Sequence, residues 1–222
     1  MLKPEQLAAY IDHTLLRADA TAADIEKLCS EAREYSFCCV CVNGSRVRDA
    51  CRLLEGSNVK VASVAGFPLG AMSTAAKCLE IQGALDDGAR EIDVVLNVGR
   101  LKDGDDNYVL RELCDIVRAA AGQTVKIILE NCLLTNDEKV RACRLVMASG
   151  AQFVKTSTGF GSGGATVEDV ALMRKIVGPA FGVKAAGGIR DAKIAMAMIE
   201  AGATRVGTSA GVAIVRSFSM LR

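Results

Sequence analysis

Short apolar runs alternate with amphipathic stretches along the whole chain. Eight of the runs are rich in Val, Ile, Cys and Phe and have the length of β-strands. They are Tyr10–Thr14, Cys38–Val42, Val59–Ala65, Glu91–Leu96, Val125–Glu130, Phe153–Thr156, Gly182–Ala185 and Arg205–Thr208. Between these runs, apolar residues recur at helical spacing, as at Val140, Cys143, Val146 and Met147. The pattern therefore predicts about eight successive β/α units.

The helical stretches begin at hydroxyl residues and end at glycines. Thr21, Thr135 and Thr166 each stand three residues before an acidic residue, which is the signature of a helix N-terminus. The expected C-terminal stops are Gly88, Gly122, Gly150 and Gly202. About eight units in 222 residues without a linker predict a single-domain (β/α)8 barrel over residues 1–222. An open doubly wound sheet is the alternative, because it has the same alternation.

The composition limits the classes of function. The chain is 50% hydrophobic and 24% charged, which is typical of a folded soluble protein. Lys plus Arg number 27 against 26 Asp plus Glu, so no excess positive charge favours nucleic-acid binding. No apolar run is long enough to span a membrane, and Lys3, Glu5 and Asp12 interrupt any signal-peptide core. Nine cysteines in such a chain indicate reduced thiols and a cytoplasmic location.

Two residue types that often carry chemistry are interpreted here as structural. Cys38 and Cys41 match a C-x-x-C spacing, but residues three apart on a strand face opposite sides. We therefore assign both cysteines to core packing. His13 is the single histidine, which excludes a His-rich zinc site and makes a Ser-His-Asp triad a poor interpretation.

Two lysines stand at the ends of predicted strands, each before a Gly-rich turn. Lys155 lies in Gln-Phe-Val-Lys-Thr-Ser-Thr-Gly, and Lys184 lies in Phe-Gly-Val-Lys-Ala-Ala-Gly-Gly. One strand–helix unit separates them, so their strands are expected to be parallel neighbours about 4.7–4.9 Å apart. A second cation and burial both favour the neutral, nucleophilic form of a lysine. A single such lysine is usually a solvated charge, whereas the pair indicates a Schiff-base enzyme.

Two acidic residues and a third lysine occupy the neighbouring predicted strands. Glu91 and Asp93 are two residues apart, so they share one face of their strand. Lys126 interrupts the apolar run of the next strand and is placed to neutralise this acidic face inside a barrel. A structural ion pair is an equally good interpretation for Glu91 and Lys126. We assign Asp93 to proton transfer, because its carboxylate could reach Lys184 across the barrel interior.

Three Gly-rich segments follow the last predicted strands. Gly159–Gly164 matches G-x-G-x-x-G, but the next helix starts only at Thr166, so we predict a flexible loop beside Lys155 instead of a dinucleotide site. Ala186–Asp191 and Val206–Gly211 follow the seventh and eighth strands. Barrels commonly bind phosphate at these two loops, through backbone N–H groups and the N-terminus of a short extra helix. The two turns therefore predict a phosphate site.

Together these motifs resemble the deoxyribose-phosphate aldolase family. The segments that carry the resemblance are Phe153–Gly159, Val183–Arg190, Glu91–Asn97 and Ile11–Leu16. The resemblance covers nearly the whole chain. It implies that Lys155 forms the Schiff base, that Lys184 lowers the pKa of Lys155 and transfers protons, and that Asp93 is a partner in the proton relay.

The same resemblance implies a substrate pocket. Its residues are Gly187, Gly188, Gly207 and Ser209 for the phosphate, and Asp12, Thr14 and Thr158 for the sugar. Some members of the family carry a lysine where Phe160 stands and a second serine where Ala210 stands. The chain is therefore expected to hold the phosphate more through its backbone.

The activity implied by the resemblance is that of a class I aldolase. Such an enzyme reversibly cleaves 2-deoxy-D-ribose 5-phosphate to D-glyceraldehyde 3-phosphate and acetaldehyde, with no metal and no other cofactor. Its partners would be phosphosugar and aldehyde molecules, not nucleic acid or membrane. The alternatives are a phosphosugar isomerase or synthase with Asp93 or Glu130 as base, and a non-catalytic phosphosugar-binding barrel. The sequence leaves the oligomeric state open, and a homo-oligomer is compatible with it.

Overall fold

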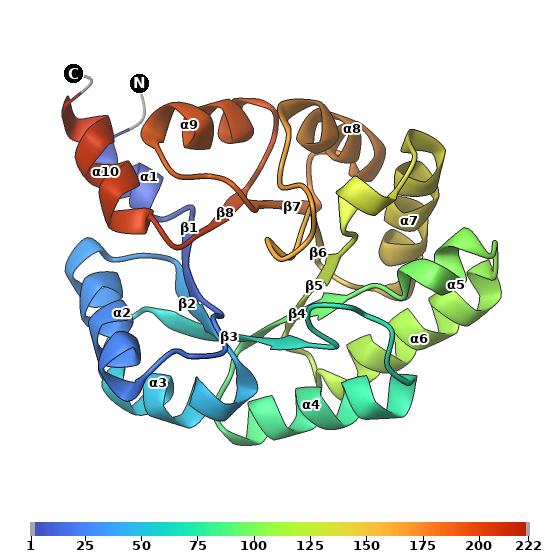
Figure 1. Ribbon diagram of the computed structural model, residues 1–222, viewed down its shortest axis with the longest axis horizontal. Helices are drawn as coiled ribbons and strands as arrows, with labels where there is room; N and C mark the ends of the chain where they lie inside the picture. Colours follow the sequence, from blue (N-terminus) through green and yellow to red (C-terminus); the bar gives the residue numbers. More distant parts are fainter. Residues whose placement is uncertain (1–2, 221–222) are drawn as a thin grey trace.

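Eight parallel strands close into a barrel in the computed structural model, which describes residues 3–220 (Figure 1). The strands are β1 (Ile11–Leu15), β2 (Cys39–Val42), β3 (Lys60–Ala65), β4 (Glu91–Val95), β5 (Thr124–Ile128), β6 (Phe153–Lys155), β7 (Gly182–Ala186) and β8 (Arg205–Thr208). Each strand pairs with the next along the chain, and β8 pairs with β1. The predicted (β/α)8 barrel is confirmed, and the open sheet is wrong, because an open sheet leaves two edge strands unpaired.

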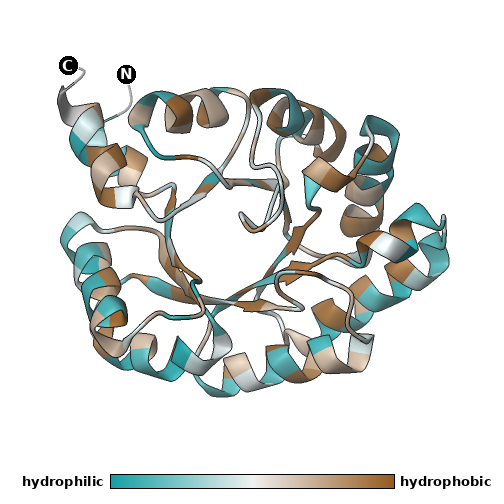
Figure 2. Ribbon diagram, viewed as in Figure 1, coloured by the Kyte–Doolittle hydropathy of each residue, from teal (hydrophilic) through white to brown (hydrophobic). Residues whose placement is uncertain are grey.

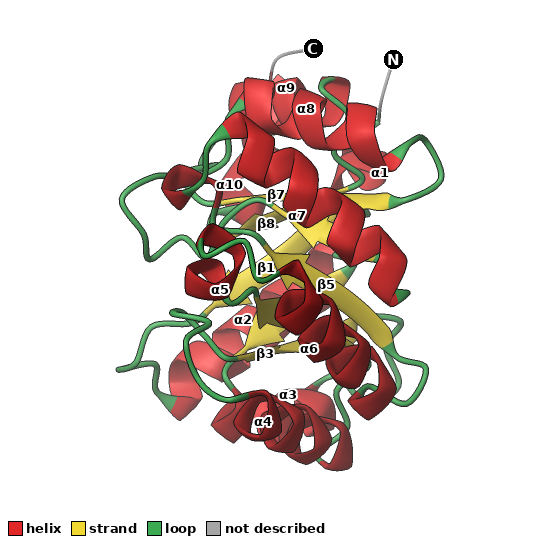
Figure 3. Ribbon diagram, turned by 90° about the vertical axis from the view of Figure 1, so that its right-hand side faces the viewer, coloured by secondary structure: helices red, strands yellow, loops and turns green. Residues whose placement is uncertain are grey.

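Helices surround the barrel on its outside. They are α1 (Pro4–Ala8), α2 (Ala22–Tyr35), α3 (Val47–Leu53), α4 (Thr74–Asp86), α5 (Val98–Lys102), α6 (Asp106–Ala119), α7 (Asn136–Ser149), α8 (Val167–Val177), α9 (Ala192–Glu200) and α10 (Gly211–Met220), with 3-10 turns η1 (Gly44–Arg46) and η2 (Asn131–Leu133). In the side view the strands run through the middle of the molecule between helices (Figure 3). No helix in the described part of the chain has the length and apolar character that crossing a bilayer requires.

The main apolar core lies between the strands and the helices. Ile92 and Val94 of β4 belong to this core, whereas Glu91 and Asp93 occupy the alternate positions and are also buried. Successive side chains of a strand point to opposite faces, so the two acids lie inside the barrel. The helices separate hydrophobic from hydrophilic faces in the same way (Figure 2). On β4 the strand period thus directs apolar side chains outward and charged side chains inward.

The predicted helix boundaries are confirmed. Thr21, Thr135 and Thr166 are the N-caps of α2, α7 and α8, and each side chain accepts a hydrogen bond from the backbone N–H three residues on. Gly150 ends α7 with a φ of 85°, in the left-handed conformation that glycine adopts without strain. The largest difference lies after β5, where Glu130 has a φ of 53° and turns the chain out of the sheet two residues early.

The cysteines and the histidine take structural positions. All nine cysteines are free thiols. Cys41 is buried inside the barrel on β2, whereas Cys38 precedes that strand and is only partly buried, so its assignment to the core holds in part. The Nε2 atom of His13 lies 2.7 Å from the carboxylate of Glu31, which ties β1 to α2.

Candidate active site

Strand register brings the two predicted lysines side by side on neighbouring strands. Lys155 ends β6 and is the register partner of Lys184 on β7. In the same way Asp93 of β4 is the partner of Lys126 on β5. All four side chains are at most 3% exposed. The closed barrel therefore places three lysines and one carboxylate in a common interior space.

Asp93 is the point where the three lysines meet. Its Oδ2 atom accepts hydrogen bonds from Nζ of Lys155 at 2.8 Å and from Nζ of Lys184 at 2.7 Å. Its Oδ1 atom accepts one from Nζ of Lys126 at 2.7 Å. Burial would raise the pKa of Asp93, but the three ammonium groups outweigh burial and hold this pKa well below its usual range. The expected approach of Asp93 to Lys184 is confirmed.

The two opposed lysines have pKa shifts of opposite sign. Burial lowers the pKa of Lys155, and the neighbouring Lys184 cation lowers it further, against the attraction of Asp93. Burial also acts to lower the pKa of Lys184, but the carboxylates of Asp12 and Asp93 raise it well above its usual value. Nζ of Lys184 lies 2.6 Å from Oδ2 of Asp12. Lys155 is thus the readier source of a neutral amine, and Lys184 remains an ammonium ion.

A second group of charges lies deeper in the barrel. Arg205 donates from Nε to Oδ1 of Asp12 at 2.6 Å and from Nη2 to Oε2 of Glu91 at 2.7 Å. Nζ of Lys126 lies 2.7 Å from the same Glu91 carboxylate, which confirms the predicted neutralisation. Asp12, Cys39 and Glu91 are close enough together to hold a metal ion. The guanidinium of Arg205 is bonded to all three, however, so this donor set is already satisfied by an organic cation.

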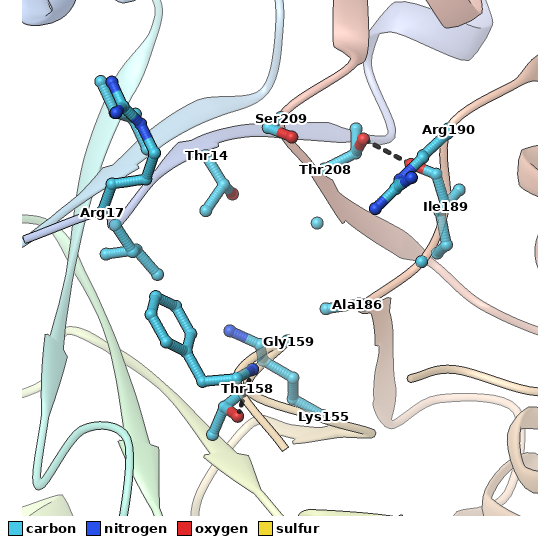
Figure 4. A pocket seen from close by; sticks show the side chains of 16 residues that line it. Thr14, Arg17, Lys155, Thr158, Gly159, Ala186, Ile189, Arg190, Thr208 and Ser209 are labelled. Carbon is cyan, nitrogen blue, oxygen red and sulfur yellow. Dashed lines mark hydrogen bonds between the residues drawn. The ribbon is translucent and has the colours of Figure 1, made fainter. Parts of the chain in front are cut away.

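A pocket of about 360 Å³ opens over Lys155 at the carboxyl ends of the strands (Figure 4). Its lining residues are Thr14, Leu15, Leu16, Arg17, Lys155, Thr158, Gly159, Phe160, Ala186, Gly187, Gly188, Ile189, Arg190, Gly207, Thr208 and Ser209. Figure 4 shows Lys155 and Thr158 on one side of the pocket and Thr208 and Ser209 across from them. The pocket therefore joins the Schiff-base candidate to the Gly-rich turns.

Most of the predicted pocket residues are brought together here. Gly187, Gly188, Gly207 and Ser209 line one cavity with Thr14 and Thr158. Asp12 is the exception: it is fully buried, bonded to Arg205 and Lys184, and is not among the lining residues. The implied contact of Asp12 with the sugar stays a prediction. The position of Asp12 on β1 points its side chain at the interior cations.

The pocket also contains two arginines, and a helix begins close to its Gly-rich turns. Arg17 and Arg190 line the cavity, although the sequence analysis assigned neither of them. The signal that could have found Arg190 is its place three residues after Gly187, inside the predicted phosphate turn. No separate short helix stands between β8 and α10 in this described stretch, and α10 itself begins at Gly211.

The loop that follows Lys155 is held in place over the pocket. The hydroxyl of Thr158 donates to the carboxylate of Glu130. The ring of Phe160 packs edge-on against Phe67, with centroids 5.3 Å apart. Farther on, a Cβ atom at Gly164 would lie 2.4 Å from the carbonyl oxygen of Gly187. The glycines thus permit a close approach between this loop and the turn after β7, and α8 starts only beyond them.

Comparisons with known proteins agree with this geometry. The model of the DeoC/LacD family aldolases matches residues 6–218. A deoxyribose-phosphate aldolase of Geobacillus sp. (strain WCH70) is 59% identical over 210 residues, which cover 94% of each chain. The deoxyribose-phosphate aldolase of Thermococcus gammatolerans (strain DSM 15229 / JCM 11827 / EJ3) is 59% identical over 213 residues, covering 94% of this chain and 95% of the relative.

Solved structures give the same result. The deoxyribose phosphate aldolase from Aeropyrum pernix, described as a unique tetrameric structure, is 37% identical with a TM-score of 0.92, covering 99% of this chain and 94% of that chain. A structure described as QR15, an aldolase, is 38% identical with a TM-score of 0.92, covering 96% of each chain. The match extends over the barrel as a whole.

Proposed function

The chain belongs to the DeoC/LacD family of aldolases, which are lyases, and from that premise we propose that it cleaves 2-deoxy-D-ribose 5-phosphate reversibly to D-glyceraldehyde 3-phosphate and acetaldehyde. Relatives named for deoxyribose phosphate support this substrate. The observation that carries the mechanism is the state of Lys155. It is a buried lysine with a lowered pKa, and it lines a pocket that also holds the predicted phosphate turns.

The first steps form a Schiff base on Lys155. The neutral amine attacks the aldehyde carbon of the open-chain sugar and gives a carbinolamine. Lys184, as an ammonium ion, supplies the proton with which the carbinolamine oxygen leaves as water. Asp93 relays the proton that passes from the attacking nitrogen to the carbinolamine oxygen. Its Oδ2 atom is placed for this, because it contacts Nζ of Lys184 at 2.7 Å and Nζ of Lys155 at 2.8 Å. The product of these steps is an iminium ion.

The iminium ion accepts the electrons of the bond that breaks. A base removes the proton of the 3-hydroxyl, the C2–C3 bond cleaves, and glyceraldehyde 3-phosphate departs, which leaves a two-carbon enamine on Lys155. The proton returns to the enamine carbon, and water hydrolyses the iminium to release acetaldehyde. We assign this proton transfer to Lys184, which is a neutral amine once it has protonated the leaving water, and Asp93 is its hydrogen-bonded partner in the relay, directly or through a water molecule.

The phosphate is held at the opposite end of the pocket. Backbone N–H groups of Gly187, Gly188 and Gly207 and the hydroxyl of Ser209 are the proposed ligands, next to the N-terminus of α10. Arg17 and Arg190 add positive charge to this end. Thr14 and Thr158 are left to contact the sugar hydroxyls.

The alternative functions account for fewer of these contacts. An isomerase would need Asp93 or Glu130 as a base. Asp93 accepts hydrogen bonds from three ammonium groups, which makes it a weak base, and Glu130 already accepts the hydroxyl of Thr158. A barrel that only bound phosphosugars would have no use for a buried lysine with a lowered pKa.

Borohydride trapping with acetaldehyde tests the proposal. We expect an ethyl adduct on Lys155, found by peptide mass spectrometry, and its loss in Lys155→Ala together with turnover. The control is Lys175→Ala, which removes an exposed lysine from α8 and is expected to keep both adduct and turnover. Folded protein without an adduct on Lys155 would contradict the mechanism.

The wider setting of the enzyme belongs to the same proposal. We infer one catalytic domain over residues 1–222 and a cytoplasmic location, which the nine free thiols support. The tetrameric relative from Aeropyrum pernix makes a homo-oligomer the form to look for. Light scattering measures that directly.

A further inference from the structure

Seven charged side chains form one continuous network inside the barrel. The carboxylates are Asp12, Glu91 and Asp93, and the cations are Lys126, Lys155, Lys184 and Arg205. The most exposed member of the network is Arg205, at 8%. Because water is largely excluded, these charges must compensate one another.

Four cations face three carboxylates, so one positive charge is in excess. Lys126 contacts Glu91 and Asp93, each at 2.7 Å. Lys184 likewise contacts two carboxylates, and the guanidinium of Arg205 cannot lose its proton. Lys155 is the cation that reaches a single carboxylate of the network, Asp93 at 2.8 Å. Its proton is therefore the one that the network loses most easily.

We propose that Arg205 and Glu91 are positioning residues that set this charge balance, and so decide the pH at which Lys155 becomes a nucleophile. The inference rests on the proposed function, in which Lys155 is the reacting amine. Arg205 acts through Asp12 and Glu91, to which it is bonded at 2.6 and 2.7 Å. By satisfying these carboxylates, it leaves Lys155 with Asp93 alone, a counter-ion that Lys155 must share with Lys126 and Lys184.

The other titratable groups around Lys155 do not change this count. Cys39 and Cys41 of β2 face the interior charges, but burial raises the pKa of each thiol, so both are neutral. Arg17 and Arg190 are exposed at the pocket, where solvent screens their charges. Lys60 reaches Glu91 from outside at 3.5 Å, but its side chain is 54% exposed.

Removing Arg205 and removing Glu91 must have opposite effects. Arg205→Met deletes a permanent cation, so the network then needs the proton on Lys155, and the pH midpoint of imine formation rises. Glu91→Gln deletes a carboxylate, so the excess positive charge grows and the midpoint falls. Each shift is expected to be about one pH unit, the size produced by a unit charge about 12 Å away at an effective dielectric constant near 20.

The experiment follows the rate at which acetaldehyde and cyanoborohydride label Lys155 as a function of pH. Wild type, Arg205→Met, Glu91→Gln and the double variant are compared by peptide mass spectrometry. The double variant restores the balance, so its midpoint is expected to return toward that of wild type. Lys60→Gln is the matched control, because it also removes a cation that contacts Glu91, but one whose side chain is exposed to solvent. The pH midpoint of labelling in this variant should move by no more than about 0.3 unit.

The outcomes separate this inference from the proposed function. Single variants that shift the midpoint in the same direction, or not at all, overturn the charge balance while the adduct on wild-type Lys155 still supports the aldolase. A wild type without that adduct contradicts the aldolase itself. Circular dichroism checks folding. If Arg205→Met does not fold, Glu91→Gln must still lower the midpoint and the double variant must raise it again.

Discussion

Lys155 and Lys184 are identical side chains on adjacent strands, yet their surroundings give them different chemistry. Both contact the same oxygen of Asp93, at 2.8 and 2.7 Å. Lys184 has a second carboxylate, Asp12, at 2.6 Å, and this extra contact keeps its proton in place. At the scale of the residue, one carboxylate gives the two lysines pKa shifts of opposite sign, which is the basis of the roles we propose for them.

Replacing Lys184 tests this division of roles. In Lys184→Met the ammonium group that supplies protons is absent, so we expect kcat to fall by about 10²–10⁴-fold. The deleted cation also lets the carboxylates hold the proton on Lys155, so trapping of Lys155 should need a higher pH. Steady-state kinetics and the pH dependence of the adduct measure the two effects.

The control for that variant keeps the charge. Lys184→Arg retains a cation but cannot give up its proton at working pH, so turnover should stay low. The trapping midpoint of Lys155 should meanwhile remain near that of wild type. Normal turnover in Lys184→Met would refute the assigned role.

At the scale of the element, two loops build the pocket by packing on each other. The loop between β6 and α8 carries Thr158 and Phe160, and the turn after β7 carries Gly187. The backbone N–H of Ala165 donates to the carbonyl of Gly187 at 3.1 Å. Glycine at 164 makes this approach sterically allowed, because a Cβ atom there would overlap that carbonyl.

A methyl group at position 164 should therefore push the two loops apart. In Gly164→Ala we expect a loss of about 1–3 kcal/mol in the free energy of unfolding and a higher KM for the phosphosugar, since the turn is a proposed phosphate ligand. Gly83→Ala is the matched control. Position 83 lies in α4 with no heavy atom within 4 Å of the added Cβ, so alanine should stabilise the protein by about 0.5–1 kcal/mol. Urea denaturation compares the two variants, and an unchanged Gly164→Ala would contradict the packing argument.

At the scale of the whole molecule, the inside of the barrel holds a cluster of charged side chains. The interior of a (β/α)8 barrel is usually filled by branched apolar side chains. Here seven charged groups occupy part of that space, and the larger apolar core lies between the strands and the helices. The outer core must therefore carry the stability that permits a charged interior.

That arrangement makes the fold sensitive to acid. Burial acts to raise the pKa values of Asp12, Glu91 and Asp93. The neighbouring lysines and Arg205 outweigh burial, so all three pKa values lie below their usual values. The unfolded chain binds protons on these carboxyls near pH 4, whereas the folded chain does not. Their stabilisation is thus present above about pH 4 and is lost as pH falls toward the folded-state pKa values.

We expect the free energy of unfolding to fall between about pH 4 and pH 3, by up to 1.4 kcal/mol per pH unit for each such carboxyl. Chemical denaturation at pH 3, 4, 5 and 7 measures the slope. The variant Arg205→Met/Glu91→Gln has one carboxyl fewer in the network and should show a shallower slope. Equal slopes in the two proteins would mean that other carboxyls cause the acid sensitivity.

The sequence alone determined the elements and pointed to the lysine pair. Eight strands, the caps at Thr21 and Thr135, and the inward face of Asp93 all follow from periodicity and from neighbours along the chain. Lys155 and Lys184 were found because both stand at the same end of adjacent strands. These features depend on local rules, so a linear pattern suffices to predict them.

Only the tertiary structure decided how Asp12 and Arg205 pair. Asp12 and Arg205 are 193 residues apart and meet because β1 closes the barrel against β8. That contact makes Asp12 a member of the interior network, which no linear pattern could predict. Arg17 and Arg190, from loops at opposite ends of the chain, likewise line one pocket only after closure. Strand period determines which face a side chain takes, but ring closure determines which charges it meets there, because it brings together strands that are far apart in the sequence.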